Sequence, residues 1–185
     1  MIPIRRAGSA FSLVVSMTGA KMGERVAQIG CAHGGRLGAI AAPVGLSGRA
    51  VAIVPDDAAA TRAQKGAAES GVLVEVEVAP PTRLPLDNDA FDVAVIDDTG
   101  GLLSTMRAED RVATVREAIR ILRPGGRVIV IGALPRGGIG ALFSRAPNEP
   151  SVDPAPALQA DGFKSVRTLA ERESLRFTEG IKPRN

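Results

Sequence analysis

The chain contains no tryptophan or tyrosine, and only five phenylalanines among its 185 residues. Proteins that bind single strands of nucleic acid stack the bases on aromatic side chains, and such side chains are scarce here. The net charge of +3 at pH 7 is modest, and arginines at isolated positions usually belong to a solvated surface. We therefore expect no nucleic-acid partner, and a core built from Ala, Val, Leu and Ile.

Cysteine and histidine are almost absent, since each occurs once, as Cys31 and His33. A single cysteine cannot form an intrachain disulfide, so an oxidising compartment is not implied. One cysteine and one histidine also cannot assemble the usual Cys/His zinc site, so we expect no metal centre of that type.

No run of residues is long and apolar enough to cross a membrane, and we expect no membrane partner. Arg5 and Arg6 precede the apolar stretch AFSLVVSM, which superficially resembles a signal peptide. That stretch is short for the hydrophobic region of a signal peptide, so we expect a packed N-terminal helical segment within residues 1–21 and a cytoplasmic location.

Strand-like and helix-like segments alternate along the chain, which predicts a parallel sheet with helices on both faces, in a single domain over residues 1–185. Alternating Val and Glu indicate a half-exposed strand near the sheet edge at 72–78. The expected strands are 25–30, 50–54, 72–78, 91–96, 127–131, 165–170 and 175–179. The expected helices are 9–19, 34–42, a segment capped by Asp56 that ends at Gly71, and 109–122.

Three connecting segments also carry expectations. The RPGG sequence at 123–126 predicts a tight turn, and ERES at 171–174 predicts a hairpin turn. Residues 133–157 are dense in Gly and Pro, with at most a short helix around 139–144, which is typical of a loop or lid.

A glycine-rich turn follows the first expected strand. Gly30, Gly34 and Gly35 allow the backbone to approach a nucleotide-like ligand closely at the carboxyl edge of a parallel sheet. The fingerprint of dinucleotide-binding dehydrogenases requires a glycine where Ala32 stands. Short-chain dehydrogenases tolerate wider spacing but depend on a catalytic tyrosine, which this chain lacks. Dehydrogenase chemistry of that kind is therefore excluded.

Three motifs occur in order: ERVAQIGCAHGG at 24–35, FDVAVIDD at 91–98 and LRPGGRVIVIG at 122–132. In this order and spacing, residues 22–180 resemble class I S-adenosylmethionine-dependent methyltransferases of the type 11-like group. The resemblance implies an α/β fold: a three-layer Rossmann-like sandwich with a mostly parallel sheet and an antiparallel C-terminal hairpin. It also implies S-adenosylmethionine as cofactor, with these contact residues: Gly30, Cys31, His33, Gly34, Asp56 and Asp97.

Three positions depart from the family pattern. The family places acidic residues where this chain has Gln28, Val54 and Pro80, and those acids support the turn, bind the ribose hydroxyls and hold the adenine amino group. A Val or Pro side chain accepts no hydrogen bond, and an unpaired polar group costs about 1–3 kcal/mol. Asp56 is an alternative partner for the ribose, although its position also suits a helix N-cap.

Few side chains are candidates for catalysis. His33 lies in the glycine turn, either as a ligand contact or as a solvated turn residue. Asp97 and Asp98 end an expected strand at the ligand-bearing edge, where they would bind an acceptor or a metal, or cap a turn. Cys31 is expected to pack as a small apolar residue rather than act as a nucleophile. Asp97 and His33 are therefore the only catalytic candidates.

Two functions remain open from the sequence. One is a methyltransferase that transfers a methyl group from S-adenosylmethionine to an unidentified small-molecule acceptor. The other is a non-catalytic protein of the same fold that has lost cofactor binding and serves as a binding or scaffold module for a protein partner. The sequence does not specify the acceptor or the oligomeric state.

Overall fold

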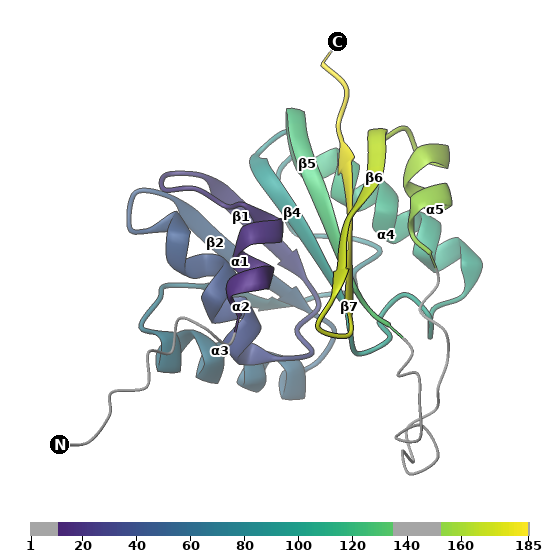
Figure 1. The fold of residues 1–185 in the computed structure, drawn as a ribbon. Coiled ribbons are helices and arrows are strands. Elements are labelled where there is room, and N and C mark those ends of the chain that lie inside the picture. Colours follow the sequence, from purple (N-terminus) through teal and green to yellow (C-terminus); the bar gives the residue numbers. More distant parts are fainter. Residues whose placement is uncertain (1–10, 135–152, 185) are drawn as a thin grey trace, which may run out of the picture.

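A computed structural model describes residues 11–134 and 153–184 (Figure 1). Its centre is a seven-stranded sheet in the order β3-β2-β1-β4-β5-β7-β6. The strands, in chain order, are β1 (Arg25–Ile29), β2 (Arg49–Val54), β3 (Glu75–Val78), β4 (Phe91–Asp98), β5 (Leu122–Ala133), β6 (Lys164–Arg172) and β7 (Leu175–Ile181). The first five are parallel, whereas β7 runs antiparallel to both β5 and β6.

Helices cover both faces of this sheet (Figure 1). They are α1 (Ser12–Thr18), α2 (Gly34–Ala41) with the short 3₁₀ helix η1 (Ala42–Val44), α3 (Asp57–Ser70), α4 (Ala108–Ile121) and α5 (Ala155–Ala160). Within the two described ranges, no helix combines the length and apolar character that a membrane span requires.

Successive strand residues point to opposite faces, so each strand contributes to two cores. On one face, Val93 and Val95 of β4 pack with residues of α1, α2 and η1, and Ala52 and Val54 of β2 pack with α3. On the other face, residues such as Ala94 pack with α4, α5 and the segment between β3 and β4. The molecule is therefore a three-layer α/β sandwich, as the sequence predicts.

Several local expectations are confirmed. Asp56 caps α3 by accepting a hydrogen bond from the Ala59 N–H at 2.8 Å, and Gly71 ends that helix with φ of +65°. Strand β3 lies at the sheet edge. The hairpin turns between β6 and β7 through Glu173 and Ser174, both with positive φ.

Other expectations are corrected. Strand β5 begins at Leu122 rather than at Arg127, and the RPGG segment forms an irregularity within it: Phe91 pairs with Leu122 but Val93 pairs with Arg127. Strand β4 continues to Asp98, two residues beyond the expected end, and the loop expected over 133–157 already becomes helical at Ala155. The expected short helix at 139–144 and the start of the helix at 9–19 lie outside the described residues.

Candidate functional site at the glycine turn

The candidate site lies where the carboxyl ends of β1 and β4 meet. These two parallel strands are neighbours, although β2 and β3 continue the sheet on the far side of β1, so the direction in which successive strands are added to the sheet reverses between β1 and β4. Open α/β sheets bind ligands at such a switch point. Gly30 follows β1 with φ of +80°, a backbone conformation that favours glycine, and the turn then enters α2.

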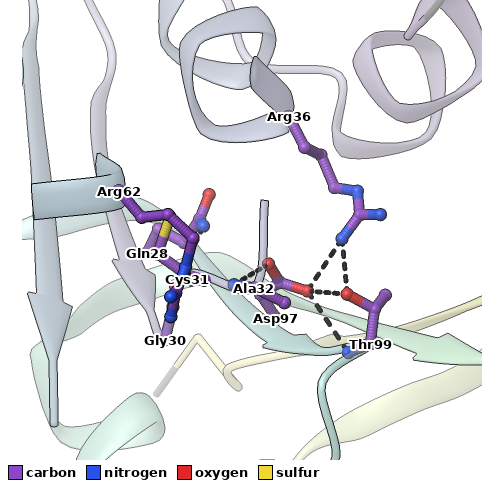
Figure 2. A network of polar contacts seen from close by, with 8 residues as sticks. All are labelled: Gln28, Gly30, Cys31, Ala32, Arg36, Arg62, Asp97 and Thr99. Carbon is purple, nitrogen blue, oxygen red and sulfur yellow. Dashed lines mark hydrogen bonds and ion pairs between the residues drawn. The ribbon is translucent and has the colours of Figure 1, made fainter. Parts of the chain in front are cut away.

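The Asp97 carboxylate ties this turn to β4 and α2 (Figure 2). One of its oxygens accepts a hydrogen bond from the Ala32 N–H at 3.0 Å. The other accepts from Arg36 Nη1 at 3.0 Å and from the Thr99 hydroxyl at 2.6 Å. The Asp97 side chain is fully buried and that of Arg36 is 12% exposed. This catalytic candidate is therefore held in an internal network.

The adjacent Asp98 points to the opposite face, because β4 extends through both residues. Its carboxylate accepts a hydrogen bond from the Leu103 N–H at 2.6 Å, so it anchors the segment that follows β4. Burial raises the pKa of Asp98 above its usual range, and the neighbouring Asp97 charge raises it further. Asp97 therefore binds the glycine turn, whereas Asp98 binds the segment that follows β4. The described part of the chain contains no cluster of metal-binding side chains.

The segment after β4 folds over the glycine turn. A Cβ placed on Gly30 would lie 2.9 Å from Leu102 Cδ2, so the leucine side chain occupies the space directly above that glycine. A Cβ placed on Gly100 would likewise lie close to the chain, at a distance of 3.1 Å from the Ala32 Cβ. On the side to which these Cβ positions point, the space beside Gly30 and Gly100 is therefore filled by the chain itself.

Phe11 covers the start of α2. Its ring lies 5.3 Å from that of His33, centroid to centroid, in a tilted arrangement. A Cβ on Gly35 would come within 3.1 Å of the Phe11 ring and 3.2 Å of the His33 ring. His33 is exposed, with no hydrogen bond from its side chain to the helix that it precedes.

Gly34 serves helix packing in this structure. A Cβ there would collide with the Arg62 carbonyl oxygen of α3 and would lie 3.0 Å from the Gly66 Cα. Helices α2 and α3 cross closely at this point, and only glycine permits that approach. The same glycine that the sequence assigns to ligand approach thus faces a neighbouring helix.

The three positions that depart from the family pattern have different surroundings. Gln28 is 1% exposed; its Nε2 donates to the Gly30 carbonyl at 2.9 Å, while its Oε1 has no hydrogen-bond partner among the described residues. Val54 is equally buried, within the apolar cluster between β2 and α3. Pro80 is exposed. Asp56, the alternative ribose partner, uses one carboxylate oxygen for the N-cap of α3.

Arginine dominates the charges beside the turn. Figure 2 shows Arg36 reaching Asp97 and Thr99, with Arg62 beside Cys31, whose carbonyl accepts a hydrogen bond from Arg62 Nε at 3.1 Å. Burial raises the pKa of the Cys31 thiol to about 11, and the Asp97 charge adds to this effect. The thiol is therefore neutral near pH 7, as expected of a packing residue rather than a nucleophile.

The described regions include two shallow cavities of about 500 and 300 Å³. The larger lies along the outer side of α4, and the smaller lies between the end of α1, β5 and the C-terminal hairpin. Neither is lined by a residue of the glycine turn.

The sequence indicates the turn but not the residues that lie around it. Arg36, Thr99 and Leu102 carry no distinctive signal, because each is common in ordinary helices and loops. The TGG sequence at 99–101 was a usable signal, since paired glycines directly after a strand allow the chain to fold back over its end.

Comparison with known proteins identifies the family. Residues 26–126, more than half of the chain, match the family model described as a methyltransferase domain. The chain belongs to this family. An uncharacterized 37.1 kDa protein of a Streptomyces fradiae transposon is 32% identical over 119 residues, which cover 64% of this chain and 33% of that protein. The chain spans about a third to a half of the length of the curated relatives that it matches.

Solved structures agree with the fold. A SAM-dependent methyltransferase from Aquifex aeolicus superposes with a TM-score of 0.73 at 18% identity, covering 97% of this chain and 93% of the other. A structure of the Haloferax volcanii Trm112 methyltransferase activator with its methyltransferase-like partner matches with a TM-score of 0.67 at 14% identity, covering 97% and 91%. At these identities the likeness establishes the Rossmann-like architecture of the methyltransferase class.

Proposed function

We propose that this chain is a methyltransferase-fold protein that does not bind S-adenosylmethionine and acts as a binding module for a protein partner. The observation that carries the proposal is the placement of Leu102 directly over Gly30. In this arrangement the glycine turn is packed against the chain's own side chain, and a cofactor would have to displace it.

The polar groups beside the turn support the same proposal. S-adenosylmethionine carries a sulfonium, an ammonium and a carboxylate group, so its net charge is positive and its two cationic groups need acidic or neutral acceptors. Asp97 is already paired with Arg36, and the guanidinium of Arg62 adds a second positive charge next to Cys31. Val54 and Pro80 offer no side-chain acceptor for ribose or adenine. A positively charged ligand would therefore gain little electrostatic stabilisation here.

Family membership favours the alternative function, methyl transfer to a small-molecule acceptor. That function requires the segment around Leu102 to move away from Gly30, and it requires other groups to replace the missing acids. A protein partner fits the first proposal, in keeping with the fold neighbour that is paired with an activator protein. We place the chain in the cytoplasm, in keeping with its single, buried cysteine.

The test is thermal unfolding of the full chain with S-adenosylmethionine or S-adenosylhomocysteine at about 1 mM. A ligand at 100 times its Kd would stabilise the fold by about 2.7 kcal/mol, which raises Tm by roughly 5–10 °C for a chain of this size. We expect no shift with either compound. A shift of that size would overturn the proposal and favour the methyltransferase.

A triple variant, Leu102→Ala with Gln28→Asp and Val54→Asp, examines why we expect no Tm shift with S-adenosylmethionine. Leu102→Ala removes the side chain beside Gly30, and the other two substitutions restore two acids of the family pattern. If the covered turn and the missing acids exclude the cofactor, the triple variant should gain a ligand-dependent Tm shift that the single Leu102→Ala variant lacks.

A further inference from the structure

The sheet has two edge strands, β3 and β6, which differ in how well they resist pairing with a further strand. Edge strands present unpaired backbone groups, and proteins commonly block them with irregular backbone or charged side chains. β6 has both features, since its pairing with β7 contains two register shifts and its Lys164, Arg167 and Arg172 are exposed. β3 pairs with β2 in unbroken register over its whole length. Of these two edges, β3 is therefore the one open to a further strand.

The backbone of β3 offers hydrogen-bonding groups on its outer side. The Ala79 N–H, directly after the strand, donates to the Val54 carbonyl of β2 at 3.0 Å. Backbone groups alternate in direction along a strand, so those of Glu77 also point to β2, whereas those of Val76 and Val78 point outward. No strand of the described residues lies beyond them.

The two faces of β3 carry side chains of different kinds. Val74 and Val76 pack with the apolar cluster between β2 and α3, and Val78, on the same face, is 51% exposed. Glu75 and Glu77 lie on the opposite face. The Glu75 carboxylate is paired with Arg49 at 2.6 Å, whereas Glu77 forms no ion pair with a described residue. An added strand would therefore meet valines on one face and an unpaired carboxylate on the other.

A second copy of β3 does not suit this edge. An antiparallel pair of β3 strands centred on Val76 would align the valines, but it would place Glu75 of each copy opposite Glu77 of the other. Like charges directly opposite each other are destabilising. A strand with basic residues at those positions replaces the repulsion with attraction.

We propose that the outer edge of β3 binds an extended segment of a partner protein in which apolar and basic residues alternate. The backbone of the segment bonds to Val76 and Val78, its apolar side chains extend the valine face, and a lysine or arginine pairs with Glu77. In such strand addition the main-chain hydrogen bonds supply affinity and the alternate side chains supply specificity. The inference rests on the proposed function, because it names the surface and the partner chemistry of a chain that acts by binding protein.

A blocked peptide of sequence VKVKVKV is the probe, and VEVEVEV is its matched control. Fluorescence anisotropy with the full chain should show saturable binding of the lysine peptide, at least about tenfold tighter than binding of the glutamate peptide. Methylating the backbone nitrogens of either the valines or the lysines separates strand addition from simple charge attraction, because only one of these sets faces β3. One methylated peptide should lose binding and the other keep it. Equal affinities of the two, or no saturable binding up to about 1 mM lysine peptide, would overturn the proposal.

Hydrogen exchange followed by NMR locates the bound peptide. In the free chain the Ala79 N–H is bonded to β2, whereas the N–H groups of Val76 and Val78 face outward. The lysine peptide should slow the exchange of these two outward amides by at least about tenfold and change that of Ala79 little. Protection that leaves Val76 and Val78 unchanged would contradict the assigned edge.

Two variants test the contacts. Val76→Pro removes an outward N–H without removing a hydrogen bond to β2, so circular dichroism should show a retained fold while affinity for the lysine peptide falls at least about tenfold. Glu77→Lys should reverse the preference between the lysine and glutamate peptides. Glu173→Lys, the same charge change in the exposed turn between β6 and β7, is the matched control and should leave the preference unaltered.

The Glu77 variant decides the matter even if Val76→Pro fails to fold, because an unchanged peptide preference would overturn the proposal. Titration of the same samples with S-adenosylmethionine keeps the two proposals distinguishable. Binding of the cofactor refutes the proposed function, whereas failure of the lysine peptide to bind refutes only the site on β3.

Discussion

The guanidinium of Arg36 lies 3.0 Å from the carboxylate of Asp97, and this ion pair joins the first turn of α2 to the end of β4. The same carboxylate holds the Ala32 N–H of the glycine turn. The chain thus supplies, from its own side chains, a positive charge at the edge where open α/β sheets bind ligands. The network joins the glycine turn, β4 and α2.

Asp97→Asn should destabilise the fold strongly, because it leaves the Arg36 guanidinium buried without its ionic partner. Breaking one side of a buried pair costs about 3–5 kcal/mol, and we expect a loss of about 3 kcal/mol in urea unfolding. Glu69→Gln is the matched control, since it makes the same carboxylate-to-amide change in an exposed pair with Lys65 and should cost less than about 0.5 kcal/mol. Equal losses in the two variants would contradict the role assigned to Asp97.

Gly34→Ala and Gly35→Ala should differ sharply, although the two glycines are adjacent in α2. The new methyl group at residue 34 meets the backbone of α3 at Arg62 and Gly66, which cannot move without separating the helices. We expect a loss of about 2 kcal/mol or more in urea unfolding. At residue 35 the atoms nearest to the methyl group belong to the rings of Phe11 and His33. The gain in helix propensity, up to about 1 kcal/mol, should offset that contact. A similar result for both variants would argue against helix packing as the reason for Gly34.

The sequence predicts the architecture well because its signals are local. Alternating Val and Glu place β3 at the edge, and Asp56 and Gly71 bound α3 through interactions within a few residues of each helix end. The site is less predictable. The sequence predicts that β4 ends at residue 96, which would leave Asp97 and Asp98 together in the loop that follows. The strand in fact continues through both residues, so their side chains point to opposite faces of the sheet. The contacts of Gly34 with Gly66, and of Gly30 with Leu102, join distant segments that no local pattern connects.

Cys31 should resist alkylation in the folded protein. Its side chain is buried, and burial raises the pKa of its thiol to about 11, so only about one molecule in a thousand carries the reactive thiolate at pH 8. Iodoacetamide should therefore modify the native chain very slowly and the urea-unfolded chain rapidly, as followed by mass spectrometry. Fast labelling of the native protein at pH 7 would show that the turn opens readily, and would weaken the case for a covered site.

Two carboxylates should give opposite dependences of stability on pH. The pKa of Glu117 is lowered, first by its hydrogen bond from Arg120, so the stability it contributes is present above its ordinary value of 4.5 and is lost as pH falls through the folded value. The cost of Glu117→Gln should therefore be largest near pH 7 and shrink in acid.

Asp98 should behave in the reverse sense. Its pKa is raised, mainly by burial, so between the ordinary value of 3.8 and its folded value the native state binds more protons than the unfolded state. The contribution of Asp98 to the free energy of unfolding therefore has its full value below pH 3.8, and it falls as pH rises through the folded pKa. Asp98→Asn removes that titration, so wild type should lose stability relative to the variant as pH increases from 4 to 7. Urea unfolding of both proteins across this range measures the difference, and a wild-type advantage that grows with pH would contradict the assigned direction.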